Sequence, residues 1–547
     1  MSSSFSQIVE TTLFKSKNGG LLPNNLKIIK HRFLSFLIWQ TIPTTLLFIF
    51  FKLFLFLFSS ISRFSFFITF FPFHFSFILF SILIFSLSSP QFRPSASVSD
   101  VVVCVGRFIF LSNLRDLSPE VGARVRVLMG FIGFVGVGGV VGVGGVGALC
   151  WGCGGFGEIV FRGFVCGVLY AFHYVYRRRW VLQFPIVQRP PYFSFKMGLP
   201  LAFQQAFRLS AAGYLFSSLL VFMLPSVLRS QPAVENFIWK QLAFGIGGFI
   251  VFLGWELNHN LHQVFNTKRF VFAPPKGSAA AETNPSEPLL AVLDESTQKS
   301  LLQYIAHLDL CMVCERNVDT WRRAAFFEET GETYKRVVAS CIRPIEQLTL
   351  KLSERLESSS VDHSYNLSHQ LRSSGEGLPD SSMVEAFYDF QLCVWCARTL
   401  SSLTAHSHKE DRFGVAQLSG SIADVISTLM SALLAVETLM GKKTHLQSPN
   451  LIGPAGMKWA TVNTGSKDST NYGLKRRDSP LYAKAYLMAD TLRTSIYEIV
   501  SVFHAEMLSS EKAGLLEKDW TSSSKPPYGT REILSQKLGL FLNFQSC

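Results

Sequence analysis

Long apolar runs separated by short basic segments dominate the first half of the chain. Six of them reach or approach the roughly 20 residues with which an α-helix crosses a hydrocarbon core of about 30 Å. They are residues 36–58, 64–87, 127–150, 159–176, 209–228 and 237–257. The run at 101–111 is only about half that length and contains Arg107, so we do not count it as a span. The pattern predicts a six-helix transmembrane domain over residues 36–257.

Lys and Arg cluster in every second connection between these runs, and this alternation predicts the orientation. Basic residues precede the first run, separate the second from the third, and follow the fourth and the sixth, whereas the other connections carry few. Because basic loops stay on the cytosolic side, both termini are predicted to be cytosolic, with residues 1–35 as a basic N-terminal segment. Arg177, Arg178 and Arg179 are interpreted as topology determinants beside anionic lipid, in preference to a nucleic-acid patch.

The second half has a different pattern. Residues 258–288 are predicted to be a linker, and residues 289–547 carry helical periodicity with polar loops at 358–382 and 442–478. The clearest helix is expected at 413–440, where apolar residues recur at steps of three and four, among them Val415, Leu418 and Ile422. Alternating β patterns are nearly absent. The predicted fold class is therefore all-α: a polytopic membrane protein with six transmembrane helices followed by a cytosolic all-α domain.

The distribution of charged residues also differs between the two halves of the chain. The 547 residues carry a formal net charge of +13, which would usually suggest a nucleic-acid partner. Residues 1–272 hold 43 of the 51 Phe and 23 Lys+Arg against 7 Asp+Glu, a balance of +16, so the remaining residues carry −3. The basic excess thus accompanies the apolar runs and indicates a membrane, with no direct nucleic-acid binding.

Few ionisable residues fall inside the predicted spans. They are Lys52, His74, Arg162, His173 and Lys240, with Glu256 at the cytosolic edge of the last span. Lys52, Arg162 and Lys240 lie near span ends, where long side chains can snorkel to the interface. No Asp or Glu falls in the middle of a predicted span, although a proton- or ion-coupled transporter would normally need such groups. A polytopic transporter or channel of the endomembrane system is therefore the less favoured alternative.

Motifs that could carry chemistry are weak. Cys311, Cys314, Cys393 and Cys396 form two CxxC pairs, but both pairs lie in apolar helical runs, where a core position is favoured over a zinc site. Gly142–Gly147 matches GxGxxG without the strand and helix of a dinucleotide site, so close helix packing is favoured. No catalytic, cofactor or metal site is predicted, and the chain is not expected to be an enzyme.

Several segments resemble the Ndc-one family of transmembrane nucleoporins. Glu410-Asp-Arg-Phe-Gly-Val-Ala-Gln417 and Leu492-Arg-Thr-Ser-Ile-Tyr-Glu-Ile-Val500 resemble the most recognisable C-terminal parts of the family. Phe184-Pro-Ile-Val-Gln188 resembles its cytosolic loop motif, and Tyr304-Ile-Ala-His-Leu-Asp-Leu310 the start of its soluble domain. Ser448–Gly456 resembles the plant branch.

The resemblance implies a structural protein anchoring the nuclear pore complex in the nuclear envelope and supporting pore assembly. The implied partners are other nucleoporins, both soluble scaffold and membrane-ring components, together with membrane lipids. Asp411, Arg412 and Phe413 are the candidate partner contacts. Asp411 could instead cap the following helix, and Arg412 could be a structural ion-pair residue.

Overall fold

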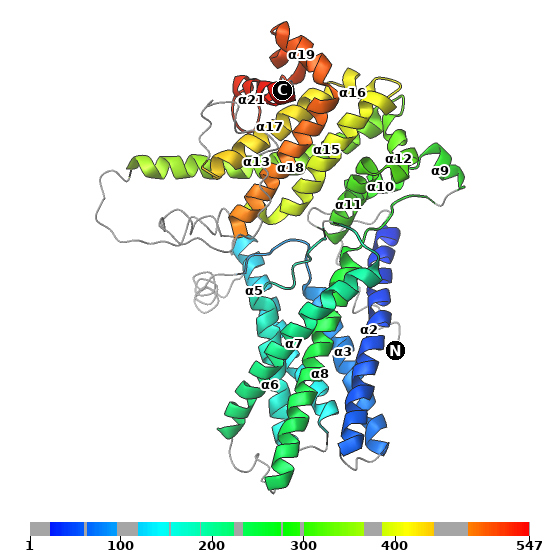
Figure 1. Cartoon of the computed structure of the whole chain (residues 1–547), viewed down its shortest axis with the longest axis vertical. Helices are drawn as coiled ribbons and strands as arrows, with labels where there is room; N and C mark the ends of the chain where they lie inside the picture. Colours follow the sequence, from blue (N-terminus) through cyan, green and yellow to red (C-terminus); the bar gives the residue numbers. More distant parts are fainter. Residues whose placement is uncertain are drawn as a thin grey trace. The chain divides into compact units, whose positions relative to one another are not determined.

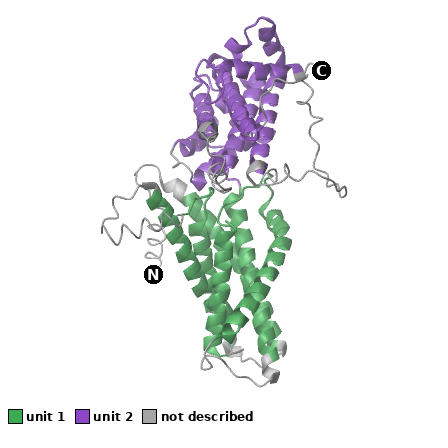
Figure 2. Ribbon diagram, turned by 90° about the vertical axis from the view of Figure 1, so that its left-hand side faces the viewer, with its two compact units in different colours: residues 1–268 green, residues 269–547 purple. Residues whose placement is uncertain are grey.

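The computed structural model divides the chain into two compact units, residues 1–268 and 269–547 (Figure 2). It describes residues 22–58, 63–95, 119–151, 155–185, 187–223, 234–274, 277–295, 300–365, 386–441 and 480–545. The boundary between Lys268 and Arg269 falls inside the predicted linker 258–288. That linker is partly helical, because the preceding helix continues to Thr267 and two short helices follow.

Unit 1 consists of long helices (Figure 1). They are α2 (Leu22–Phe58), α3 (Arg63–Leu87), α5 (Pro119–Leu149), α6 (Phe156–Tyr176), α7 (Pro191–Phe222) and α8 (Val234–Thr267). All six predicted spans begin within these helices. The fifth, 209–228, is seen in α7 as far as Phe222, and its last residues lie outside the described part of the chain.

Six described helical segments are long and apolar enough to cross a membrane. They are Lys27–Phe56, Phe67–Leu87, Val121–Leu149, Phe156–Tyr176, Ile238–Thr267 and Ser421–Leu439. The last segment belongs to unit 2. In its apolar 18-residue stretch 72% is buried, against 28–50% in the corresponding stretches of the other five. Its apolarity is therefore explained by a position in the core of unit 2. The helix in unit 1 that is absent from this set is α7.

Unit 1 exposes many large apolar side chains in addition to those in its core. On α3, the ring of Phe77 is fully buried, whereas Phe71 is 72% exposed. The Phe-rich segment thus supplies aromatic rings to the interior, with Phe80 beside Tyr170 and Trp255. It also supplies an exposed apolar face, which would be unfavourable in water. A helix that is hydrophobic all round suits a lipid environment.

Glycines bring α5 and α6 into close contact. A Cβ on Gly142 would lie 2.2 Å from the carbonyl oxygen of Gly163, and one on Gly167 equally close to that of Gly138. Each helix contributes two glycines four residues apart, which puts them on one face and lets the backbones touch. The prediction that Gly142 serves helix packing is confirmed.

Unit 2 is also helical in its described residues. Its helices are α9 (Ala279–Thr283), α10 (Glu287–Glu295), α11 (Leu301–Glu315), α12 (Thr320–Ala324), α13 (Glu332–Tyr365), α15 (Phe390–Glu410), α16 (Val415–Leu418), α17 (Ser421–Leu439), α18 (Pro480–Val502), α19 (His504–Lys512), α20 (Leu516–Trp520) and α21 (Arg531–Gln545). Short 3₁₀ turns include η3 (Asn317–Asp319). The core lies among α11, α13, α15, α17 and α18, whose inward faces are apolar.

In unit 1, α2 begins at Leu22, inside the predicted N-terminal segment 1–35. In unit 2, two further boundaries differ from the sequence prediction. The helix expected at 413–440 is broken at Gly420, where φ is +67°, so α16 and α17 are separate helices. α13 continues to Tyr365, into the predicted loop 358–382. The rest of that loop beyond residue 365 and the predicted loop 442–478 lie outside the described residues.

Candidate contact surface and buried polar sites

Asp411 shapes the turn between α15 and α16. Its Oδ1 accepts a hydrogen bond from the backbone N–H of Phe413 at 3.2 Å, and its Oδ2 accepts one from that of Ala416 at 2.8 Å. The carboxylate therefore satisfies the Ala416 amide, which the first turn of α16 leaves free, and forms a local Asx turn with the Phe413 amide. Of the two roles considered for Asp411, the structure supplies the geometry of the capping role.

Arg412, Phe413 and Leu418 project from this turn. Arg412 is exposed, Phe413 is 53% exposed and Leu418 is 85% exposed. The sequence stripe placed Leu418 on the buried face of one long helix, and this placement is wrong. Because the helix stops at Gly420, the periodicity that buries Ile422 and Val425 does not extend back to Leu418.

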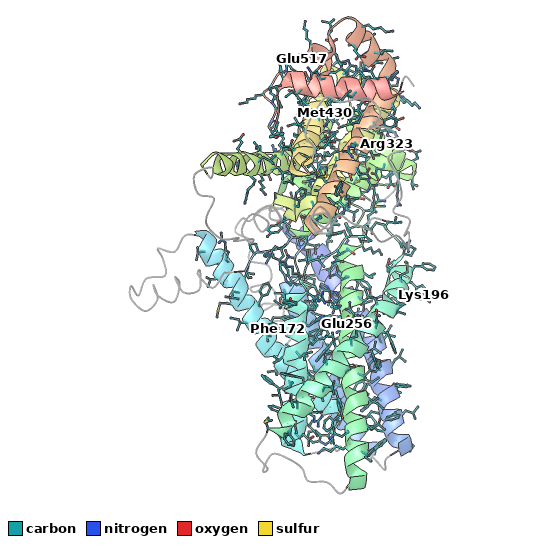
Figure 3. All side chains as sticks on the ribbon, turned by 60° about the vertical axis from the view of Figure 1, so that its left-hand side comes forward. Phe172, Lys196, Glu256, Arg323, Met430 and Glu517 are labelled. Atoms are coloured by element: carbon teal, nitrogen blue, oxygen red, sulfur yellow. The ribbon has the colours of Figure 1, made fainter. Side chains whose placement is uncertain are left out.

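The buried guanidinium of Arg323 binds the end of α15, next to this turn. Arg323, on α12, donates to Glu410 Oε1 at 2.5 Å and Oε2 at 2.9 Å, to Asn317 Oδ1 at 3.2 Å and to the carbonyl of Cys314 at 3.0 Å. Arg323 is only 1% exposed. The end of α15 and η3 are thus held against the same side chain, which is labelled in Figure 3.

The three consecutive arginines after α6 have different surroundings. Arg179 is paired with Glu256 of α8, through contacts of 2.5 and 2.6 Å. Arg178 has φ +55° and lies 4.4 Å from the ring centroid of Phe92, while Arg177 is exposed. Only Arg177 and Arg178 are therefore on the surface, and Arg179 is bound inside unit 1.

Arg162 and Lys240 do not snorkel as the sequence suggested. Glu158 lies between them, accepting from Arg162 Nε at 3.1 Å and from Lys240 Nζ at 2.5 Å. Arg162 also donates to Ser218 at 3.0 Å and to Gln241 at 3.1 Å. All three charged side chains are at most 6% exposed. A charge removed from water is tolerable only when it is paired, and this cluster links α6, α7 and α8.

α2 carries a cation near each end, and both bind carbonyl oxygens. Lys52 donates to the carbonyls of Ala148 and Leu149, at the end of α5, at 3.1 and 3.3 Å. Arg32 donates to the carbonyls of Phe265, Asn266 and Lys268, at the end of α8. Cations at helix C-termini satisfy free carbonyls and complement the helix dipole. Lys52 is thus buried rather than snorkelling.

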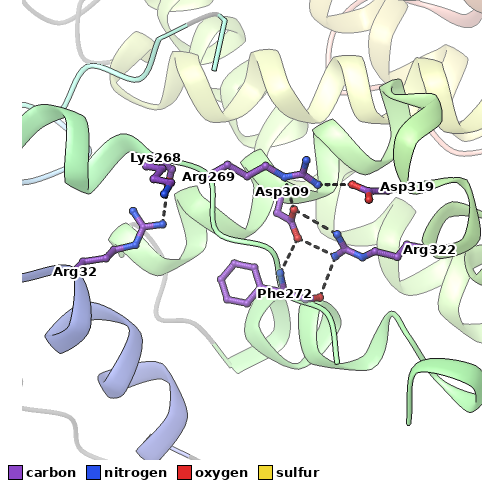
Figure 4. A network of polar contacts seen from close by, with 7 residues as sticks. All are labelled: Arg32, Lys268, Arg269, Phe272, Asp309, Asp319 and Arg322. Atoms are coloured by element: carbon purple, nitrogen blue, oxygen red, sulfur yellow. Dashed lines mark hydrogen bonds and ion pairs between the residues drawn. The ribbon is translucent and has the colours of Figure 1, made fainter. Parts of the chain in front are cut away.

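Asp309 organises the first residues of unit 2 (Figure 4). Its carboxylate accepts from Arg269 Nε at 2.7 Å, from Arg322 Nη2 at 2.8 Å and from the backbone N–H of Phe272 at 3.0 Å. Asp309 itself is fully buried. Although burial opposes the charged form, Asp309 and Asp319 raise the pKa of Arg269. The sequence resemblance included Asp309 within 304–310 but gave it no role.

The four cysteines considered for zinc are buried in the core of unit 2. Burial raises the pKa of the Cys311 and Cys393 thiols, which disfavours the thiolate that a metal requires. Among the described residues, no group of three or more His, Cys, Asp or Glu side chains is arranged to hold a metal ion.

The described chain is thus a helical protein with membrane-compatible helices and a second helical unit. The family model described as "Nucleoporin protein Ndc1-Nup" matches residues 159–388 and 378–507. "Nucleoporin NDC1" of Xenopus laevis is 29% identical over 144 residues, which are 26% of this chain and 18% of the relative. "Nucleoporin NDC1" of Danio rerio is 30% identical over 126 residues, 23% of this chain and 16% of the relative.

The chain belongs to the Ndc1 family of nucleoporins, because the family model matches more than half of its length. The aligned part spans less than a fifth of each of these two relatives. The family match begins at residue 159, close to the start of α6, and thus covers α6 to α18. The segment that resembled the plant branch, 448–456, lies outside the described residues.

Proposed function

We propose that this protein is a structural transmembrane nucleoporin that anchors the nuclear pore complex in the nuclear envelope and supports pore assembly. The carrying observation is that the family match runs from the apolar helices of unit 1 into the helical unit 2. Unit 1 offers an apolar surface for lipid, and unit 2 offers a helical surface for other nucleoporins, both soluble scaffold and membrane-ring components.

The charge distribution supports a topology with both termini on the cytosolic or pore side. Arg177 and Arg178 are exposed at the end of α6, and Lys268 follows α8. At the other end of these helices, Lys240 and Arg162 are bound to Glu158 within the bundle. Among the described residues, exposed positive charge therefore lies at the end of α6 and just after α8, in accordance with the positive-inside rule. Residues 36–257 would form the transmembrane domain, and residues after 268 the cytosolic domain.

Tagging the full chain with a fluorescent protein tests this function. We expect a punctate nuclear rim that coincides with pore markers, and fewer pores when the protein is depleted. A signal confined to the plasma membrane or a vacuole would contradict the proposal. Protease protection of tags placed at each terminus and in the α7–α8 connection would test the orientation separately.

Transport is the less favoured alternative. The buried rings of Phe80, Tyr170 and Trp255 pack against one another in the interior of unit 1. The buried charged groups of unit 1 are paired, Arg162 and Lys240 with Glu158 and Arg179 with Glu256, which favours a structural role for them. Solute or ion flux across proteoliposomes containing the purified chain would favour transport over anchoring.

A further inference from the structure

The turn that follows α6 divides its basic residues into an exposed pair and an internal one. Arg177 and Arg178 are exposed, whereas Trp180 is only 2% exposed. Both oxygens of the buried Glu256 accept hydrogen bonds from Arg179, so the charge of this carboxylate is matched within unit 1. Two positive charges therefore remain on the outer side of the turn.

The backbone of this turn is held from two directions. The N–H of Arg177 donates to the carbonyl of His173 on α6 at 2.9 Å. The segment after α3 binds the other end, because the N–H of Ser89 donates to the carbonyl of Trp180 at 3.1 Å and the N–H of Leu182 donates to that of Ser89 at 2.9 Å. The exposed arginines thus project from a pre-organised support, which lowers the entropy cost of binding a ligand.

Arg178 adopts a backbone conformation that disfavours a side chain. Its φ is +55°, and no other non-glycine residue in the described part of the chain has a positive φ. Such a conformation costs conformational free energy, and glycine would adopt it freely. The guanidinium lies 4.4 Å from the ring centroid of Phe92, a cation–π contact that orients the side chain. The backbone alone therefore does not explain an arginine at this position.

Two aromatic side chains indicate the depth of this turn in the membrane. Phe172 and Tyr176 are 62% and 73% exposed, and their stacked rings have centroids 6.2 Å apart. Both belong to the last turns of the candidate span Phe156–Tyr176. Exposed aromatic residues at a span end favour the boundary between hydrocarbon and headgroups. The next two side chains, those of Arg177 and Arg178, are therefore expected at the level of the phosphates.

The described surface of unit 1 carries charge of one sign. The acidic residues of unit 1 whose side chains are described are Glu158 and Glu256, and both are buried and ion-paired. Every charged side chain that the structure describes as exposed in unit 1 belongs to Lys or Arg. Over the sequence of residues 1–272, 23 Lys+Arg face only 7 Asp+Glu, so the remaining acids do not reverse this excess.

We propose that Arg177 and Arg178 bind the headgroup of an acidic phospholipid in the cytosolic leaflet. Each guanidinium can donate two parallel hydrogen bonds to phosphate oxygens, and an acidic lipid adds the negative charge that a zwitterionic lipid lacks. The inference rests on the part of the proposed function in which unit 1 spans a membrane. A nucleic acid fits less well, because the exposed Phe172 and Tyr176 favour an apolar neighbour beside the turn.

Native mass spectrometry of the full chain in detergent tests this proposal. Phosphatidylserine or phosphatidylcholine with the same acyl chains is added, and the bound lipid is quantified. We expect Arg177→Gln/Arg178→Gly to reduce the affinity for phosphatidylserine about tenfold and to leave that for phosphatidylcholine unchanged. Glycine at position 178 suits φ +55°, so the variant keeps the fold while it loses the guanidinium. An unchanged affinity for phosphatidylserine would overturn the proposal.

Two matched variants separate a site from general surface charge. Arg189→Gln/Lys196→Gln removes two other exposed cations of unit 1, and Arg316→Gln/Arg343→Gln removes two from unit 2. We expect both variants to bind phosphatidylserine nearly as well as the unsubstituted chain does. A loss in Arg189→Gln/Lys196→Gln as large as that in the turn variant would show that binding follows net charge alone, and the assignment to Arg177 and Arg178 would be wrong.

Further measurements distinguish the lipid from other anions. Inorganic phosphate alone should not displace bound phosphatidylserine, because the acyl chains also contact the apolar surface. Displacement by phosphate, or an oligonucleotide that binds the unsubstituted chain but not the turn variant, would overturn the proposal. Nuclear-rim localisation of the tagged chain is scored separately. A rim without a lipid effect of the turn variant refutes only this inference, whereas absence of the rim for the unsubstituted chain refutes the proposed function.

Discussion

Arg179 and Glu256 form a two-point ion pair between the end of α6 and the middle of α8. Nη1 and Nη2 of Arg179 donate to Oε1 and Oε2 of Glu256 at 2.5 and 2.6 Å, and the Glu256 side chain is 1% exposed. Arg179 also lies 5.8 Å from the ring centroid of Tyr174. The planar guanidinium matches the carboxylate at both oxygens, so the pair fixes the rotation of α6 against α8.

Removing one member of this pair should destabilise unit 1. Glu256→Gln or Arg179→Met leaves the other charge buried without its partner, for which we expect a loss of about 3–5 kcal/mol. The double variant Arg179→Met/Glu256→Met should lose less than the sum of the single losses. Thermal unfolding of the full chain in detergent measures this. Additive losses in the double variant would show that the two residues do not act as a pair.

The α5–α6 crossing should reject any side chain at its central glycine. Gly142→Ala forces a methyl group to 2.2 Å from the carbonyl oxygen of Gly163, so the helices must separate and lose packing. Gly133→Ala is the matched control on the same helix, because nothing lies within 4 Å of a Cβ there. We expect Gly142→Ala to lower the unfolding temperature and Gly133→Ala to leave it unchanged or raise it. Equal effects would contradict the close crossing.

Asp309 should govern the order of the first residues of unit 2. Asp309→Asn weakens the acceptor for Arg269, for the buried Arg322 and for the Phe272 amide. We expect faster hydrogen exchange at the backbone amides of residues 269–272 in the full chain, and lower stability because Arg322 remains buried without its charge partner. Asp319→Asn, which removes only the outer partner of Arg269, should have a smaller effect. The reverse order would rule out Asp309 as the organising residue.

Glu437 should make the docking of α21 sensitive to acid. Burial raises its pKa, but Lys537 and Arg493 outweigh burial, and the net pKa lies below the ordinary 4.5. A carboxyl group with a lowered pKa stabilises the fold above its ordinary pKa, and this contribution is lost as the pH falls through the folded value. Glu437→Gln should therefore weaken protection of α21 amides at neutral pH, and the difference from the unsubstituted chain should shrink as the pH falls below the ordinary pKa of 4.5. A difference that persists unchanged at low pH would contradict this role.

Much of the fold could be predicted from local sequence, for reasons that differ between the two units. The candidate membrane helices α2, α3, α5, α6 and α8 were predicted from continuous apolar runs, since a membrane helix must be apolar along its length. In unit 2, Ser300 caps α11 by accepting from the amide of Gln303, and helical periodicity located α13, α15 and α18. These signals are local, so they are visible without knowing which helices meet.

The contact surface at Asp411, Arg412 and Phe413 stays a prediction. The sequence singled out Asp411, Arg412 and Phe413, but Leu418 was assigned to the core because its spacing matches Ile422. Only the left-handed backbone conformation at Gly420 separates the two residues, and a single glycine in a helical pattern does not by itself predict that the helix ends there. Arg323 bridges Asn317 of η3 and Glu410 of α15, and no local sequence signal indicates this long-range contact.

The sequence alone determined where apolar surface is continuous, where basic residues alternate and where helices begin. The tertiary structure decided which charge pairs with which. Arg162 and Glu158 are four residues apart and could be paired from sequence, but Lys240 reaches Glu158 from 82 positions away. Helix formation depends on neighbours along the chain, whereas the partner of a buried charge depends on which helices cross and at what height. That choice is made only when the helices pack, because an unpaired charge in the interior costs more than any local preference can offset.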